Sequence, residues 1–199
     1  MVKGIFPLLI FLVFHLNTQN CHAKTTAYTI EFSGIKVGNL YTNVQTVNGI
    51  TIYQLSSLVD FWMVVKVKIA YKIVVKFDAT KMLESQVNSL ANGNSYHSTI
   101  IWNEDHYNMD CHTYKYDYTA TRTEPIKSSL LQLYFIKPES DCLMLSENYG
   151  KDASVKKIAE DVYQVETQGN KNKYHYKNGI LVMAEMHSPV KNYLIKIVE

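Results

Sequence analysis

The sequence predicts an all-β protein in which a large antiparallel meander curls into a barrel or half-barrel. Residues that favour strands are frequent, with fifteen Tyr, seven Phe and two Trp in 199 residues. Apolar and polar residues alternate with a period of two, and Asn-Gly dipeptides separate successive alternating segments. Short turns between strands give an antiparallel meander, and a twisted sheet of about eleven to thirteen strands tends to curl or close.

Residues 1–23 have the composition of a secretory signal peptide. Lys3 supplies the positive start, and the apolar run 5–14 is too short to cross a bilayer as a helix. We expect cleavage before Lys24. The alternative is lipid attachment at Cys21, but the three residues before it are not the small residues that such processing needs. Export to the periplasm or the extracellular space follows, with association with the cell envelope left open.

A single β domain is expected over residues 24–199, and its clearest strand covers residues 63–77. The odd positions of this segment are apolar or aromatic, while Lys66, Lys68, Lys72 and Lys76 occupy even positions. A helix would mix these two sets of side chains, whereas a strand separates them. Because the segment would span about 50 Å, it must curve strongly or contain a bend. The odd face is expected to line the concave side of the sheet.

The other elements follow from the same alternation and from turn residues. Further strands are expected over residues 28–32, 40–47, 50–58, 82–91, 95–102, 106–112, 162–167, 173–177, 180–186 and 193–198. Asn48-Gly49, Asn92-Gly93 and Asn178-Gly179 are expected to turn hairpins, because both residue types tolerate positive φ. The segment 128–136 differs, since serines that can cap a helix precede helix-forming residues and Pro138 follows. We expect one short helix there, covering an open end of the sheet.

Several motifs in the second half of the chain carry a family resemblance. They are Leu133-Tyr134-Phe135 followed by Pro138, Ser146-Glu147-Asn148-Tyr149-Gly150 and Tyr174-His175-Tyr176-Lys177-Asn178-Gly179, with Gly34 and Gly38 earlier in the chain. In order and spacing they resemble a family of exported bacterial proteins of unknown function, typical of Bacteroidota. In general character this family is similar to periplasmic carriers built on an incomplete, strongly curved β-barrel, such as the lipoprotein carriers. The resemblance implies no catalytic residues, and a shared fold does not establish a function.

Charge and motifs limit the classes of function. A formal net charge of +2 and a single Arg are unlike a nucleic-acid-binding protein. The sequence has no metalloprotease, nucleophile-elbow, Cys-x-x-Cys or phosphate-loop motif. No run of about 18 apolar residues predicts a membrane-spanning helix. We therefore expect no enzymatic activity, no cofactor, no nucleic-acid partner and no integral membrane segment.

Two polar groups of residues deserve separate interpretations. His106, Asn108, Asp110 and His112 share one face of a strand and could ligate zinc or supply a base and its orienting partner. Ligands about 7 Å apart along one strand splay apart, however, so a solvent-facing polar stripe is preferred and no metal site is expected. Ser146-Glu147 is interpreted as a turn with a buried hydrogen bond.

Cys111 and Cys142 are the only cysteines that remain after removal of the leader. In an oxidising compartment they could form one disulfide that closes a loop of about 30 residues and contributes roughly 3–4 kcal/mol. Two separate buried thiols are the alternative. The sequence slightly favours the disulfide.

A set of large aromatic residues gives the main indication of function. Its members are Phe61, Trp62, Tyr71, Phe77, Trp102, Tyr134 and Phe135. They could simply fill the concave side of the sheet, or they could line a cavity for an apolar ligand, with the two tryptophans at its mouth. We expect a non-catalytic binding protein or carrier for a lipid or another apolar or amphiphilic ligand of the cell envelope. The alternative is an interaction module that docks an envelope protein through a sheet edge or the lysine face.

Overall fold

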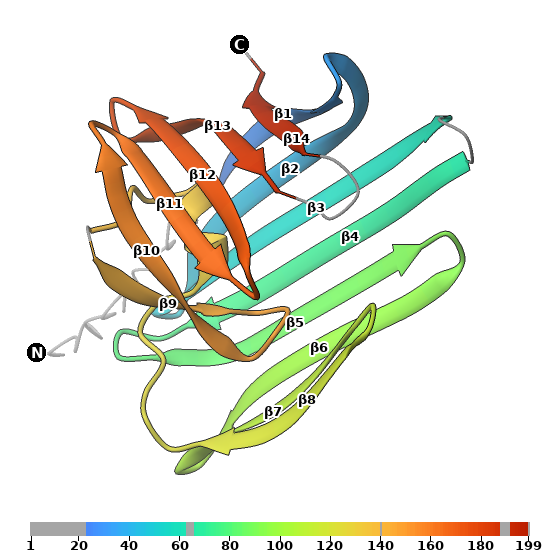
Figure 1. The fold of residues 1–199 in the computed structure, drawn as a ribbon. Coiled ribbons are helices and arrows are strands. Elements are labelled where there is room, and N and C mark those ends of the chain that lie inside the picture. The colour runs from blue at the N-terminus through green and yellow to red at the C-terminus, as the bar shows by residue number, and fades with distance from the viewer. Residues whose placement is uncertain (1–22, 63–65, 140, 188–191, 199) are drawn as a thin grey trace, which may run out of the picture.

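The computed structural model describes residues 23–62, 66–139, 141–187 and 192–198, so residues 1–22 of the expected signal peptide lie outside the described residues. One antiparallel sheet of 14 strands forms the fold, in the order β8-β7-β6-β5-β4-β3-β2-β1-β14-β13-β12-β11-β10-β9 (Figure 1). The strands are β1 (Lys24–Phe32), β2 (Ile35–Val47), β3 (Ile50–Trp62), β4 (Lys66–Phe77), β5 (Met82–Ala91), β6 (Asn94–Asn103), β7 (His106–Thr113), β8 (Tyr116–Arg122), β9 (Cys142–Ser146), β10 (Lys151–Ala159), β11 (Val162–Thr167), β12 (Asn170–Lys177), β13 (Ile180–Met186) and β14 (Tyr193–Ile197). The predicted all-β meander is confirmed. In the described part of the chain, no helix is long and apolar enough to cross a membrane.

The three predicted Asn-Gly hairpins are confirmed by their backbone angles. Both residues of each pair have positive φ, at 51° and 78° for Asn48-Gly49, 48° and 88° for Asn92-Gly93, and 53° and 77° for Asn178-Gly179. Such turns match the right-handed twist of the strands that they join. Local turn chemistry therefore sets these three strand pairings.

The central hairpin differs in its limits from the strand expected over residues 63–77. β3 continues to Trp62 and β4 begins at Lys66, while residues 63–65 lie outside the described residues. Phe61 pairs with Val67 and Trp62 with Lys66 in a continuous antiparallel register. The aromatic pair at the end of β3 therefore belongs to a different strand from the lysine row of β4.

Three strands, β8, β9 and β10, were not among those expected from the sequence. β8 has the sequence YDYTATR and no fully buried residue, so its alternation carries a weak apolar signal. In β10 the buried inward positions are the small residues Ala153 and Val155. β9 has only five residues and buries Met144, Leu145 and Ser146 in succession, so it shows no alternation with a period of two.

One short helix interrupts the meander, as predicted for the segment 128–136. It is the 3-10 helix η1 (Leu130–Tyr134), whose N-cap is Ser129. Leu131 and Leu133 are buried, and Tyr176 Oη donates a hydrogen bond of 2.7 Å to the Leu133 carbonyl oxygen. The helix contacts β3, β9 and β13. It therefore lies inside the curve of the sheet and fills part of the concave side.

The two ends of the curled sheet meet through side chains, because within the described residues no ladder joins β8 to β9. Tyr116 Oη on β8 donates to the carbonyl oxygen of Tyr149, at 2.9 Å. Arg122 Nη1 lies 2.9 Å from Asp152 Oδ1 on β10. The fold is therefore a barrel-like sheet that stays open at one seam.

Cys111 and Cys142 are free thiols in this structure, which corresponds to the alternative to the disulfide that the sequence slightly favours. Cys111 is buried on β7 and lies against the turn between β9 and β10, where a Cβ at Gly150 would sit 3.0 Å from its Sγ. Cys142 lies at the start of β9, away from that turn, and its Sγ donates a hydrogen bond of 3.2 Å to the Glu139 carbonyl oxygen. The two thiols therefore have separate environments.

Candidate functional site

A cavity of about 720 Å³ remains on the concave side of the sheet. The hairpin of β3 and β4 supplies its apolar wall, in which Phe61 faces Val67 and Val59 faces Ile69 across the two strands. The odd residues of β4 thus line the concave side, as the alternation predicts. Further along the same face, Phe77 is buried in the packed core.

Next to the apolar wall, hydrogen-bonded polar side chains form a second part of the cavity surface, which we call the polar floor. Tyr71 and Asn148 form its centre, with Tyr71 Oη 3.0 Å from Asn148 Oδ1 and 2.8 Å from Asn148 Nδ2. Ser98 Oγ on β6 donates to the Asn148 carbonyl oxygen at 3.1 Å. Burial raises the pKa of Tyr71, which keeps its phenol protonated and able to donate.

Glu147 lies beside this floor in the turn between β9 and β10. The residue is 2% exposed, and its Oε1 accepts a hydrogen bond of 2.8 Å from the backbone N–H of Leu131 in η1. Burial raises the pKa of the Glu147 carboxyl group, partly offset by hydrogen bonds that include the one from Leu131. The turn with a buried hydrogen bond, expected from the sequence, is confirmed.

Tyrosines from distant strands complete the deep side of the cavity. The ring of Tyr134 in η1 makes edge contacts with Tyr28 at 5.9 Å and Tyr174 at 6.2 Å between centroids. Tyr193 of β14 also lines the cavity, and burial raises the pKa of Tyr134, Tyr174 and Tyr193. Neutral phenols next to apolar side chains give the site a mixed character.

The aromatic residues proposed from the sequence divide into two groups. Phe61, Tyr71 and Tyr134 line the cavity together. The other four are placed elsewhere: Phe77 in the core, Phe135 against Tyr53 at 5.0 Å, Trp102 against Tyr107 at 4.8 Å and under Lys81, and Trp62 at the end of β3 with 74% of its surface exposed. Neither tryptophan is among the residues that line the cavity.

Sequence reasoning missed the polar residues of the cavity, among them Asn148 and Asn172. Asn148 was visible only as part of the motif around Ser146-Glu147, and nothing in that motif shows that it meets Tyr71. The partners are 77 positions apart in the chain. Contacts of this kind depend on how the sheet curls rather than on local pattern.

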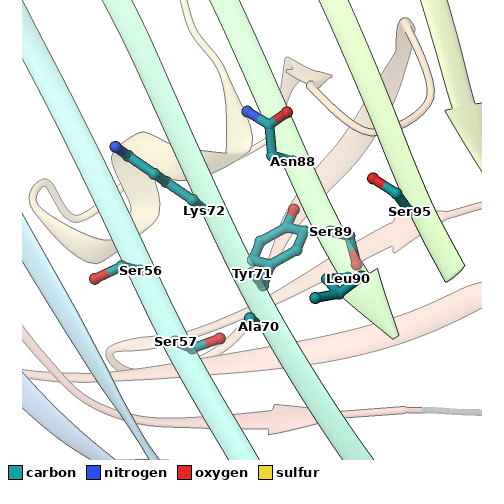
Figure 2. A pocket seen from close by; sticks show the side chains of 9 residues that line it. All are labelled: Ser56, Ser57, Ala70, Tyr71, Lys72, Asn88, Ser89, Leu90 and Ser95. Carbon is teal, nitrogen blue, oxygen red and sulfur yellow. The ribbon is translucent and has the colours of Figure 1, made fainter. Parts of the chain in front are cut away.

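The outer face of the same strands carries a shallower depression of about 350 Å³ (Figure 2). Ala70, Leu90 and Lys72 are among its lining residues, and Leu58, which pairs with Ala70, is 53% exposed. Two lysines of the row on β4 form ion pairs, Lys66 with Asp60 at 3.7 Å and Lys76 with Glu84 at 2.6 Å. This face therefore combines positive charge with some exposed apolar surface.

The polar stripe on β7 is split by the structure. His106 pairs with the neighbouring Asp105, at 2.6 Å between Nδ1 and Oδ1. Asp110 and His112 lie 2.9 Å apart, between Oδ1 and Nε2, toward the other end of the strand. Their side chains alternate with the buried Met109 and Cys111, so they project from the outer face of the sheet.

Comparisons with known proteins agree with this architecture. A family model described as a domain of unknown function (DUF6134) matches residues 28–198. A solved structure that is similar is the crystal structure of a beta-barrel-like protein of the domain of unknown function DUF1849 from Brucella abortus. Its TM-score is 0.51 at 11% sequence identity, and the match covers 90% of this chain and 96% of that one. At this identity the likeness concerns the fold alone, and no curated protein matches the chain.

Proposed function

The chain belongs to the DUF6134 family, a domain of unknown function, and we propose that it is an exported, non-catalytic binding protein or carrier for an apolar or amphiphilic ligand. The single observation that supports this proposal is the unfilled concave side of the sheet. Its volume of about 720 Å³ lies in the range of small-molecule sites, about 300–1,000 Å³. Apolar walls with a few convergent polar groups are typical of such sites.

The distribution of side chains favours an amphiphilic ligand. Val59, Phe61, Val67 and Ile69 present a continuous apolar wall to one part of the cavity. Burying an apolar chain against that wall is favourable by about 25 cal/mol per Å² removed from water. A hydroxyl, carbonyl or ester group of the ligand could bond to the phenols of the deep side.

The polar side chains of the cavity support a non-catalytic role. Tyr71 and Asn148 bond to each other, and Glu147 bonds to the backbone of η1. These contacts hold the curled sheet and η1 together. The polar groups thus have structural partners, and their remaining capacity suits recognition of a ligand.

A displacement assay with a fluorescent fatty-acid analogue tests the proposal. The analogue should bind saturably to the delipidated full chain, and palmitate or a lysophospholipid should compete. Val59→Gln places an amide on the apolar wall and should weaken binding about tenfold or more, the equivalent of losing one buried aliphatic contact. Leu58→Gln is the matched control, because Leu58 is the adjacent residue on β3 and points to the outer face. It should leave the dissociation constant unchanged.

An interaction module remains the alternative, supported by the lysine row and the outer depression near Leu58. Absence of saturable binding across fatty acids, lysophospholipids and sterols would refute the ligand-binding proposal and favour this alternative. Equal effects of Val59→Gln and Leu58→Gln would also contradict the cavity as the binding site. Export itself is tested by N-terminal sequencing of the mature protein, which should begin near Lys24.

A further inference from the structure

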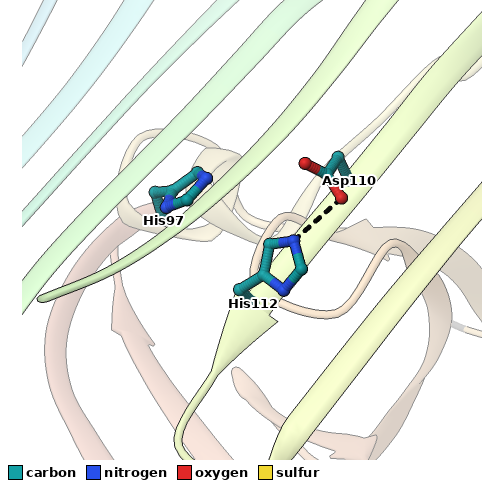
Figure 3. Close-up of side chains that lie close together, drawn as sticks. All are labelled: His97, Asp110 and His112. Atoms are coloured by element: carbon teal, nitrogen blue, oxygen red, sulfur yellow. Dashed lines mark hydrogen bonds and ion pairs between the residues drawn. The ribbon is translucent and has the colours of Figure 1, made fainter.

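We infer that His97, Asp110 and His112 bind a first-row divalent transition-metal ion, with Zn²⁺ the best match, on the outer face of the sheet. The three side chains come from neighbouring strands and gather in one place (Figure 3). His97 and His112 are also among the residues that border the proposed ligand cavity, but the inference does not depend on a ligand there.

The two histidines lie next to each other on neighbouring strands. β6 and β7 pair antiparallel, with Ser98 opposite Cys111, and the next residue toward that end of each strand is a histidine. Ser98 and Cys111 are buried, so His97 and His112 project from the opposite, outer face. Their ring centroids are 5.3 Å apart. A cross-strand pair of this kind brings two imidazoles to a common point, which two positions on one strand do not.

Asp110 supplies the third ligand. It is two residues from His112 on the same face of β7, and its Oδ1 is 2.9 Å from His112 Nε2. One ligand atom from each of His97, Asp110 and His112 lies within 4.8 Å of the others. Metal–ligand bonds of about 2.0–2.2 Å require ligand atoms about 3.4 Å apart. Small rotations of these partly exposed side chains reach that spacing.

The supporting group is Asp117 on β8. Its Oδ1 lies 2.6 Å from His112 Nδ1, the ring nitrogen that does not face Asp110. A carboxylate in this position accepts the Nδ1 proton in a hydrogen bond, so a metal ion would be bound through Nε2, which in this structure hydrogen-bonds to Asp110 instead. Thr119 Oγ1 in turn donates to Asp110 Oδ1 at 3.2 Å. Ligands with such outer partners are typical of metal sites.

The donor set indicates the kind of ion. Two imidazoles and one carboxylate suit Zn²⁺ and other first-row divalent ions, whereas Mg²⁺ and Ca²⁺ prefer oxygen ligands alone. In a tetrahedral arrangement a fourth position stays open to water or to an anionic group. Ion pairing of His112 with its two aspartates would account for those three residues alone. It gives no reason for the His97 ring to lie 5.3 Å from a second imidazole.

Titration of the full chain with ZnCl₂ by isothermal calorimetry tests the inference, with protein purified without a polyhistidine tag. One Zn²⁺ should bind per chain at this site. His97→Ala and His112→Ala should each weaken it by about tenfold or more, and Asp117→Asn by about 10–100-fold although it removes no ligand. His106→Ala is the matched control, because His106 is a histidine of β7 that also pairs with an aspartate, Asp105, and lies outside the cluster. Its affinity should equal that of the wild type.

Co²⁺ provides a second readout that a merely structural role would not change. The wild-type chain should give the visible absorption of tetrahedral Co²⁺, and His97→Ala should lose it while its circular dichroism stays native. Absence of saturable Zn²⁺ binding, or binding that survives both His97→Ala and His112→Ala, would overturn the site. If His112→Ala unfolds the chain, His97→Ala decides, because His97 is exposed and forms no part of the core.

Discussion

Replacement of Glu147 tests how the polar side of the cavity is held together. Its carboxyl group is 2% exposed and accepts the Leu131 N–H at 2.8 Å. Glu147→Leu keeps a side chain of similar size and leaves this buried N–H without an acceptor. Such an orphaned donor costs about 1–3 kcal/mol. For a chain of this size, each kcal/mol lowers Tm by about 2–4 °C, so we expect a loss of roughly 2–12 °C.

Glu147→Gln should act differently, because an amide oxygen can still accept the Leu131 N–H. Burial raises the pKa of Glu147 in the folded state above its value in the unfolded chain, which is about 4.3. As pH rises from the unfolded-state pKa to the folded-state pKa of Glu147, the unfolded chain releases the carboxyl proton first, so ionisation works against folding. This destabilisation of the folded state is complete at pH values above the folded-state pKa and is absent well below pH 4. Glutamine does not titrate and escapes it.

The measurement is thermal unfolding followed by circular dichroism between pH 4 and pH 8. The Tm of Glu147→Gln minus that of the wild type should increase with pH and then level off. Glu139→Gln, at an exposed position, should show no such trend. A difference that does not vary with pH, or a Glu147→Leu variant as stable as Glu147→Gln at pH 7, would refute this account of the polar floor.

Three further predictions concern the frame of the sheet. Gly38→Ala should destabilise the fold by about 1–3 kcal/mol in urea denaturation, because a Cβ at position 38 would lie 2.3 Å from the Leu58 carbonyl oxygen. A variant as stable as the wild type would show that β2 and β3 can move apart at this point without cost. Iodoacetamide should modify native Cys142 well before Cys111, since burial raises the pKa of Cys111 to about 11. Dithiothreitol should leave Tm unchanged, and a fall in Tm on reduction would show that the two cysteines form a disulfide. Tyr107→Phe should cost about 1–3 kcal/mol, because the buried phenol bonds two backbone groups; an unchanged midpoint of chemical unfolding would contradict this.

The sequence was informative wherever structure depends on neighbouring residues. The alternation along β4 assigned Val67 and Ile69 to the concave face and Lys68 to the outer face, since successive side chains of a strand point to opposite sides. The Asn-Gly turns were equally local. Strand limits were less accurate, because the hairpin formed by β3 and β4 and the apolar strand expected over residues 63–77 look alike in a period-two pattern.

Features formed by distant segments could not be obtained in this way. Tyr71 meets Asn148 only because the sheet curls until the turn between β9 and β10 faces β4. The residues of the proposed metal site are also brought together by the sheet: Asp110 and His112 lie on one strand, and the β6–β7 register places His97 beside them. Register and curvature are properties of the whole sheet.

The cavity itself follows from the sizes of the inward-facing residues. Phe77, Met82 and Ile100 are large and buried in the packed core, whereas Leu130, Leu131 and Tyr134 of η1 border the cavity. Beside the apolar wall of β3 and β4, the neighbouring strands β5 and β6 present Ser89 and Ser98 to the cavity. Small residues on the concave face of a curved sheet leave volume that no side chain reaches, whereas interiors normally fill such space. The unfilled space is thus encoded at particular positions, as the proposed ligand-binding role requires.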